Sequence, residues 1–235
     1  MRLNKQITVI YITASRLREP FATYVRDVLW KAKGGLPLIS VSKQPLDYGQ
    51  NLCFNGPVGV WNEYFETYQG VLAAKTKYVA IAEDDTLYSY QHFEQIPVPG
   101  SFTFNVACWQ IYTWVKPAMY SWKGRRNHNG LICERDLYIK EMEERFSKYP
   151  TPESIKNVLP SFGEPSRYEG GLGITVYPAA DLMIPIPNVR FCHEDDAQGW
   201  LSQGSHKRLG NLRAYDVYFW GPAEALVEKY REVLP

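Results

Sequence analysis

Three short apolar segments near the start of the chain narrow the possible folds more than any other feature. They cover residues 7–12, 36–41 and 78–82, and the first is apolar on both faces and rich in β-branched residues. Such segments are typical of central strands in a parallel sheet that is covered on both sides. Residues 21–33 and 58–74 lie between them and have apolar side chains at helical spacing. The order therefore predicts right-handed βαβ units in an open, doubly wound α/β sheet.

Polar residues follow each predicted strand, at the sheet edge where open α/β proteins bind ligands. The sharpest feature there is Glu83-Asp84-Asp85, because a buried strand delivers three carboxylates to its exposed end. Crowded carboxylates repel one another, and a hard divalent cation such as Mg²⁺ or Mn²⁺, which prefers oxygen ligands, would neutralise them. A solvated acidic turn or a helix cap is the alternative interpretation.

The second half of the chain mixes strand-like and helical patterns and shows no clean domain boundary. We expect one domain over residues 1–235, with a nucleotide-binding half to about residue 90 and an acceptor half after it. The pattern predicts strands within 102–115, 174–177 and 182–192, a helix over 134–148, a loop with one short helix over 151–173, and a last helix from Gly221-Pro222.

Composition argues against several classes of protein. The formal net charge is +1, so the chain lacks the positive excess typical of duplex-binding proteins. Its four cysteines form no CxxC pair, and scattered cysteines indicate buried thiols in a reducing compartment. The apolar part of the N-terminus is too short for a signal-peptide core, and proline and glycine interrupt the uncharged stretch 95–115. These observations predict a soluble, cytoplasmic protein without a membrane span.

Residues 5–90, approximately, resemble the GT-A glycosyltransferases, in particular the family 2-like group of bacterial and phage type. The D-x-D-type motif of that group stands here as Glu83-Asp84-Asp85 within KTKYVAIAEDDTLY, and ITVIYITASR resembles its first strand and donor-binding loop. The stretches SVSKQPLDYGQN and GLICERDLYIKEMEERF are also similar. The usual P-x-Y-N-type ending of the first loop is absent, and the resemblance is weaker in the second half.

The resemblance implies a GT-A fold with an open, mostly parallel twisted sheet, flanking helices and a smaller acceptor-side sheet. It also implies metal-dependent, inverting transfer of a hexosyl or pentosyl group from a nucleoside-diphosphate sugar, with UDP as the expected nucleotide. The acceptor would be a saccharide, a lipid-linked molecule or, as a minority idea, a modified nucleic acid. A nucleotidyltransferase of related fold and a non-catalytic carbohydrate- or nucleotide-binding protein are the alternatives.

Individual roles follow from the positions that match the motifs of the family. The donor would contact the loops after the first two strands and the first two acids of the motif, namely Thr13, Ala14, Ser15, Arg16, Ser42, Lys43, Glu83 and Asp84. Asp85 would bind the metal ion. His193 would complete the metal shell, with His206 as the alternative.

The general base that an inverting transferase needs has two candidates. Glu169 lies in a Gly-rich loop with Glu164 close by. Asp195 belongs to the run Glu194-Asp195-Asp196, which resembles the ED signature of these enzymes. A retaining mechanism would need neither residue as a base.

A basic loop with interspersed aromatic residues, 116–128, has two interpretations. Its Arg125 and Arg126 would bind the diphosphate or an anionic acceptor, because a guanidinium group binds two phosphate oxygens at once. The alternative is a solvated surface whose arginines pair with nearby acids.

Overall fold

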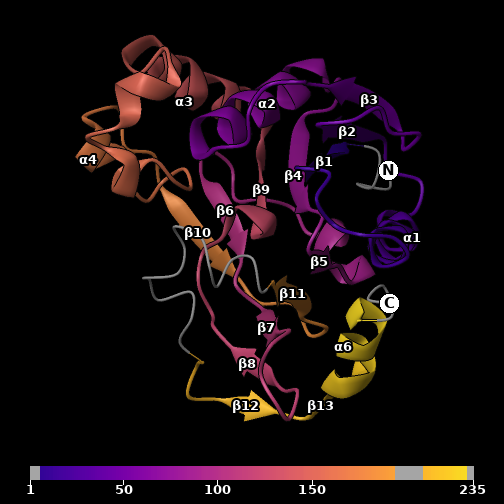
Figure 1. Ribbon diagram of the computed structural model, residues 1–235. Coiled ribbons are helices and arrows are strands. Elements are labelled where there is room, and N and C mark those ends of the chain that lie inside the picture. Colours follow the sequence, from indigo (N-terminus) through magenta and orange to yellow (C-terminus); the bar gives the residue numbers. More distant parts are fainter. Residues whose placement is uncertain (1–5, 194–208, 232–235) are drawn as a thin grey trace.

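The computed structural model describes residues 6–193 and 209–231, which form two main sheets with helices packed around them (Figure 1). The larger sheet has seven strands in the order β10-β6-β9-β4-β1-β2-β3. These are β1 (Ile7–Thr13), β2 (Leu38–Ser42), β3 (Gln50–Cys53), β4 (Tyr78–Glu83), β6 (Phe102–Asn105), β9 (Leu131–Glu134) and β10 (Ala179–Leu182). Only β9 runs antiparallel to its neighbours, so the chain has a mixed α/β fold with a mostly parallel sheet.

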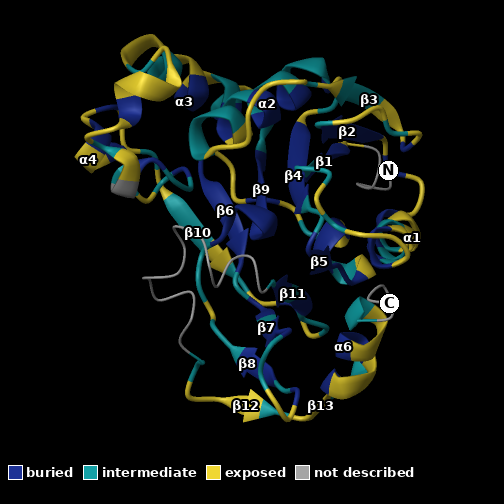
Figure 2. Cartoon of the chain, viewed as in Figure 1, coloured by how far each residue is buried: buried dark blue, intermediate teal, exposed yellow. Residues whose placement is uncertain are grey.

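Helices cover both faces of this sheet, which explains the apolar strands. Alternate residues of β1 face opposite sides: Ile10 and Ile12 belong to one apolar cluster, and Val9 and Tyr11 belong to another. The second cluster includes Leu29 of α1 (Phe21–Lys33). Figure 2 shows the resulting band of buried residues through the central strands.

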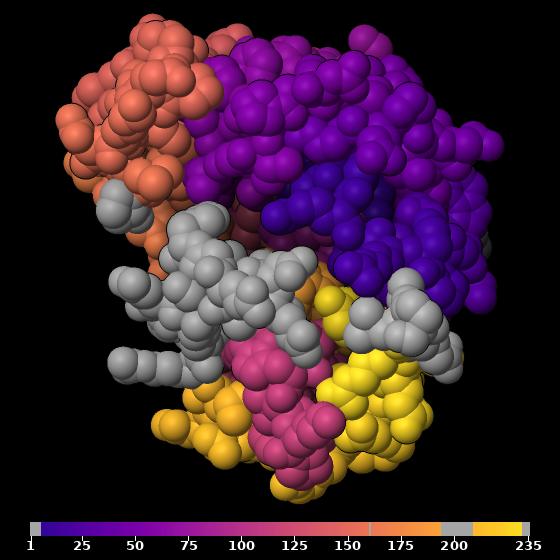
Figure 3. Space-filling view, in the orientation of Figure 1, coloured from indigo at the N-terminus to yellow at the C-terminus, as the bar shows by residue number. Residues whose placement is uncertain are grey.

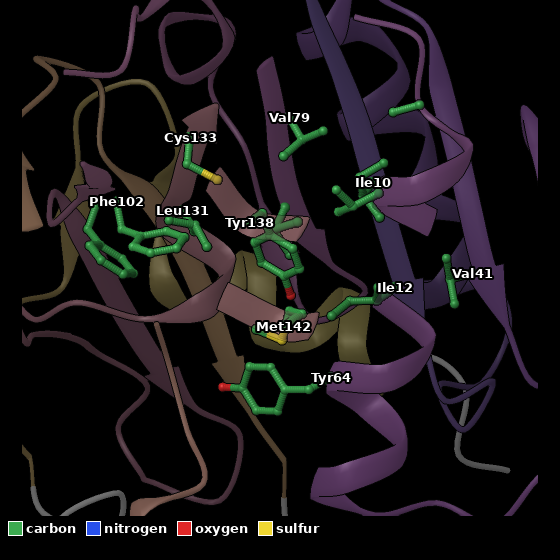
Figure 4. Packing of buried hydrophobic residues seen from close by; sticks show 14 of the residues in the cluster. Ile10, Ile12, Val41, Tyr64, Val79, Phe102, Leu131, Cys133, Tyr138 and Met142 are labelled. Atoms are coloured by element: carbon green, nitrogen blue, oxygen red, sulfur yellow. The ribbon is translucent and has the colours of Figure 1, made fainter. Parts of the chain in front are cut away.

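The first cluster contains side chains of α2 (Val60–Ala73) and α3 (Arg135–Lys148). Figure 4 shows Tyr64 of α2 and Tyr138 and Met142 of α3 among the apolar side chains of the strands. The remaining helical segments are short, apart from the last: η2 (Tyr90–Glu94), η3 (His128–Gly130), η4 (Pro152–Ile155), η5 (Leu159–Ser161), α4 (Glu169–Leu172) and α6 (Ala223–Arg231).

The smaller sheet has five strands in the order β12-β8-β7-β11-β5. They are β5 (Thr86–Leu87), β7 (Cys108–Tyr112), β8 (Tyr120–Trp122), β11 (Asn188–Cys192) and β12 (Arg213–Ala214); β13 (Asp216–Val217) and β14 (Gly221–Pro222) form a separate pair. Only Asp84 and Asp85 separate β4 from β5. The chain therefore passes from the larger sheet to the smaller one at the acidic turn.

Helix α1 contacts both sheets. Its first residue, Phe21, packs edge-on against Phe191 of β11, with ring centroids 4.8 Å apart, and against Tyr230 of α6 at 5.1 Å. Two turns further along the same side of the helix, Leu29 belongs to the core of the larger sheet. One helix thus packs the two sheets together beside the acidic turn.

Several expectations from the sequence are confirmed and others are wrong. The long helices and the three apolar strands form as predicted, although α2 starts at Val60 rather than Val58. Residues 174–177 are irregular, and the strand expected there begins only at Ala179 as β10. Residues 102–115 form two strands, β6 and β7, in different sheets. β3 and β9 lie outside the expected strands. The position of β9 depends on pairing with β4 and β6, which lie far from it in the sequence.

No helix in the described part of the chain is both long and apolar enough to cross a membrane. All four cysteines are free thiols, and Cys108, Cys133 and Cys192 are buried as expected. Cys53, at the end of the edge strand β3, is exposed.

His92 in η2 is fully buried, and its Nδ1 atom accepts hydrogen bonds from two side-chain amides. Asn105 Nδ2 lies 3.1 Å from this atom, and Asn188 Nδ2 lies 3.4 Å from it. Both amides are held in this orientation by backbone N–H groups that donate to their oxygens. Burial lowers the pKa of His92 to about 3, so the imidazole is neutral in the folded protein.

We expect His92 to make the fold acid-sensitive. The unfolded chain binds a proton at this imidazole below about pH 6.5, whereas the folded chain does not until about pH 3, so stability falls as the pH falls through this window. The loss between pH 7 and pH 5 should be about 2 kcal/mol. Urea unfolding at both pH values should show that His92→Gln loses about 2 kcal/mol less than the parent chain. An equal loss in both proteins would contradict the assignment.

Candidate functional site

Strand order places a crevice at the carboxyl ends of β1 and β4. The chain runs outward from β1 through β2 to β3 and then returns to the other side of β1 as β4. Open α/β sheets bind ligands where the strand order reverses in this way. The space-filling view shows a recess beside the indigo residues of the N-terminal segment (Figure 3).

Thr13 and Asp84 lie side by side at this edge of the sheet. The Oγ1 atom of Thr13, the last residue of β1, donates a hydrogen bond of 2.5 Å to Asp84 Oδ2. The same Oγ1 accepts the backbone N–H of Ser15 at 2.9 Å, and Ser15 has a left-handed φ of 55°. Two of the residues predicted to bind a donor are therefore joined directly, and their contact fixes the course of the loop.

The carboxyl group of Asp84 lies in an electrostatically unusual position. Burial, and then the neighbouring carboxylate of Asp85, raise its pKa to about 7, while the Thr13 hydrogen bond and the charge of Arg16 oppose the shift. Arg16 is exposed, and Ala14 and Ser15 beside it are half-buried. The loop after β1 thus leaves a cationic side chain at the mouth of the crevice.

Asp85 is held by a partner from the smaller sheet. Arg190 Nε of β11 lies 2.9 Å from Asp85 Oδ2, and the hydroxyl of Thr86 donates to Asp85 Oδ1 at 2.8 Å. Thr86 in turn accepts a hydrogen bond of 3.0 Å from the side-chain amide of Asn129. Asp85 is 7% exposed, and both its oxygens are engaged in this network. A protein cation therefore supplies part of the neutralisation that the sequence suggested for a metal.

Glu83 also contacts Arg190, but at a longer distance than Asp85 does. Its Oε2 lies 3.7 Å from Arg190 Nη2, and its backbone N–H donates to the hydroxyl of Tyr88 at 2.9 Å. Burial raises the pKa of Glu83 well above its ordinary value; Arg190 opposes the shift, whereas Asp85 and Glu63 add to it. In return, the carboxylates of Asp85 and Glu83 raise the pKa of Arg190 against the effect of burial.

A second group of potential ligands adjoins the acidic turn. Glu63 of α2, Glu83 and His128 of η3 each have one ligating atom, and these atoms lie within 4.8 Å of one another. No other three His, Cys, Asp or Glu side chains among residues 6–193 and 209–231 come that close. Asp85 and His193, the predicted metal ligands, belong to no such group within the described residues, and their metal-binding role stays a prediction.

The predicted donor contacts after β2 are occupied by contacts within the protein. Ser42 is fully buried, and its hydroxyl donates to the carbonyl of Gln44 at 2.6 Å and accepts from Asn51 Nδ2 at 2.8 Å. Lys43 forms an ion pair with Glu66 of α2. Both residues lie at the expected edge of the sheet, and their contact with a donor stays a prediction.

The two arginines of the basic loop differ in their surroundings. Arg126 forms a two-pronged ion pair with Asp181 of β10, at 2.6 and 3.3 Å, on the surface. Arg125 is half-buried, and burial, followed by the positive charge of Arg190, lowers its pKa. Arg125 is therefore the arginine of the pair whose charge interacts with Arg190.

The candidates for the general base fall in different parts of the chain. Glu169 starts α4, is 1% exposed, and accepts hydrogen bonds from the backbone N–H groups of Ser166 and Tyr168. These contacts give it a local structural role, and its role as a base stays a prediction. Glu164 lies 3.6 Å from Arg167 at the surface. Asp195 and His206 lie outside the described residues, whereas the His193 ring contacts Tyr230 of α6 at 5.2 Å.

Sequence reasoning missed three side chains that the structure brings to the acidic turn. Arg190 lies in the run before His193, but the sequence gives no sign that β11 pairs with β5. Glu63 is an acid in the first turn of α2, where an acid is common at any helix start. His128 ends the basic loop that was expected to bind phosphate. Only the fold reveals that these residues converge.

No protein-family model matches the chain, and no curated protein matches it. Among solved structures, the chain is similar to a glycosyltransferase involved in the glycosylation of the major capsid of PBCV-1. The sequence identity is 11% and the TM-score is 0.39, over 78% of this chain and 92% of that chain. A likeness of this degree defines neither the fold family nor the activity, so the site itself has to support any functional conclusion.

Arg190 should be essential for stability. Arg190→Met leaves the buried Asp85 carboxylate without its cation, which typically costs about 3 kcal/mol or more. The matched control is Arg126→Met, because the Arg126–Asp181 pair lies at the surface, where such pairs contribute about 1 kcal/mol or less. Urea unfolding should separate the two variants clearly, and Arg190→Met/Asp85→Leu should recover part of the loss. Equal losses in the two single variants would contradict this account.

Proposed function

We propose that this chain is a glycosyltransferase of GT-A type, which transfers a sugar from a nucleoside-diphosphate sugar to the hydroxyl group of an acceptor. The observation that supports it best is the Thr13–Asp84 hydrogen bond, which joins the end of β1 to the acidic turn after the neighbouring strand β4. The two segments that most resemble the family in sequence are thereby in direct contact, which supports a shared site. UDP is the proposed nucleotide.

The site has groups suited to the chemistry of the leaving group. When the bond between the sugar and the donor phosphate breaks, negative charge builds on the nucleoside diphosphate, and fixed positive charge lowers the barrier. Arg125 and Arg190 lie close enough for their charges to repel. An anion between the two guanidinium groups would relieve that repulsion, so this pair is the proposed phosphate contact of the protein itself.

A divalent cation, Mn²⁺ or Mg²⁺, is part of the proposal, because carboxylates gather where the diphosphate would lie. When bound, such an ion would act as a Lewis acid on the phosphate oxygens. The acceptor would enter from the smaller sheet, which already supplies Arg190 to the site. Its hydroxyl would lose a proton to an acid, and Glu169 and Asp195 stay the proposed candidates, with a retaining mechanism as the alternative.

Binding of UDP tests the location of the donor site. Thr13→Val keeps the shape of the side chain but removes the hydrogen bond to Asp84, and we expect it to weaken UDP binding about tenfold, the equivalent of about 1.4 kcal/mol. Thr8→Val is the matched control, because Thr8 lies on the same strand and bonds to Thr76 at 2.7 Å at its opposite end. Calorimetry with UDP and MnCl₂ should show unchanged affinity for Thr8→Val.

Release of UDP from UDP-sugars tests the activity. Slow hydrolysis of at least one sugar donor in a panel, weakened in Thr13→Val, would support a transferase. UDP binding without any turnover would favour the non-catalytic alternative. Absence of nucleotide binding in the parent chain would overturn the proposed function.

A further inference from the structure

Three structural elements bring Glu63, Glu83 and His128 together beside the acidic turn. Glu63 lies in the first turn of α2, Glu83 ends β4, and His128 starts η3. One ligating atom of each lies within 4.8 Å of the other two. Two carboxylates and one imidazole, from segments far apart in the sequence, therefore converge on one point.

His128 provides the observation that points to a ligand. The residue is 3% exposed, and its Nδ1 atom is buried with no hydrogen-bond partner among the described residues. The nearest carboxylate oxygen in an ion-pair arrangement is Glu63 Oε1 at 3.6 Å, beyond hydrogen-bond distance. A buried polar atom without a partner typically costs about 1–3 kcal/mol. The Nδ1 atom thus faces the two carboxylates with its bonding capacity unused.

The other side of the imidazole is already fixed. His128 Nε2 lies 3.2 Å from the hydroxyl of the buried Tyr138. In the tautomer with the proton on Nε2, this N–H donates a hydrogen bond to the hydroxyl oxygen, and the Nδ1 lone pair is available. The ring also lies against Tyr64, with centroids 4.8 Å apart. Histidines that bind metals almost always donate their second N–H in this way, which fixes the tautomer and the orientation of the ring.

We propose that Glu63, Glu83 and His128 bind one divalent transition-metal ion of the Mn²⁺ type. Bond lengths of about 2.0–2.2 Å to nitrogen and oxygen ligands place neighbouring ligands about 3 Å apart. The three ligating atoms now lie within 4.8 Å of one another, so binding requires small side-chain movements. Glu63 is free to move because its side chain is 48% exposed. The imidazole favours Mn²⁺ or Zn²⁺ over Mg²⁺, which prefers oxygen ligands and retains its water.

The site differs from the one expected from the sequence in a way that the structure explains. Asp85 is engaged by Arg190 and Thr86, and it is not one of the three residues whose ligating atoms converge. Glu83 is shared, since its Oε2 lies 3.7 Å from Arg190. Three protein ligands leave coordination positions open, and a diphosphate in the crevice could fill them. That last use of the ion rests on the proposed function, whereas metal binding itself does not.

Titration of the full chain with MnCl₂ in the absence of nucleotide, followed by electron paramagnetic resonance, tests the site. We expect one bound Mn²⁺ per chain, displaced by Zn²⁺ more readily than by Mg²⁺. Glu63→Gln and His128→Gln should each weaken binding by about 100-fold, and Tyr138→Phe by about tenfold through the second N–H of the histidine.

The matched control is Glu164→Gln, because Glu164 adds negative charge near Glu83 but is not one of the three ligands. It should change the Mn²⁺ affinity less than threefold. Circular dichroism must show each variant folded, and the exposed Glu63 keeps the test valid if His128→Gln does not fold. No Mn²⁺ binding by the parent chain, or equal affinity in Glu63→Gln and Glu164→Gln, would overturn the proposal. UDP calorimetry reports separately on the donor site.

Discussion

The ion pair between Arg190 and Asp85 is the interaction on which the rest of the site depends. It joins β11, an inner strand of the smaller sheet, to the turn at which the chain leaves the larger one. Because the carboxylate is nearly buried, a partly satisfied network would be costly, and the hydroxyl of Thr86 and the amide of Asn129 complete it. The relative position of the two sheets is thereby fixed by polar contacts at the crevice itself.

This arrangement separates three acids that look equivalent in the sequence. Asp84 contacts Thr13, Asp85 contacts Arg190, and Glu83 lies between Arg190 and the group formed with Glu63 and His128. A strand places successive side chains on opposite faces, so neighbouring acids at its end meet different surroundings. Their roles therefore follow from what each one faces.

The sequence was sufficient for the local elements and for the edge at which the site forms. Residues 7–12 and 78–82 show buried parallel strands because both faces are apolar, and the loops after them do meet. The sequence was insufficient where the position of a residue depends on pairing between strands that are distant along the chain. The pairing of β11 with β5 brings Arg190 to the acids. The pairing of β9 with β4 brings η3, which holds His128 and directly precedes β9, to the same place. Residue type also gives no sign of the local contacts of Ser42 and Glu169, whose polar atoms are engaged by neighbouring backbone and side-chain groups.

The antiparallel strand β9 has a further consequence for how the chain can be divided. It fills the position between β4 and β6, so one edge of the central strand β4 stays unpaired until residues 131–134 have been made. An apolar strand with an open edge is a template for pairing with another chain. The first 90 residues hold the crevice loops, yet cut off from the rest they would expose β4 and associate with copies of themselves. The N-terminal half therefore depends on β9 from the second half to cover the edge of β4. A fragment that ends before β9 would aggregate instead of folding.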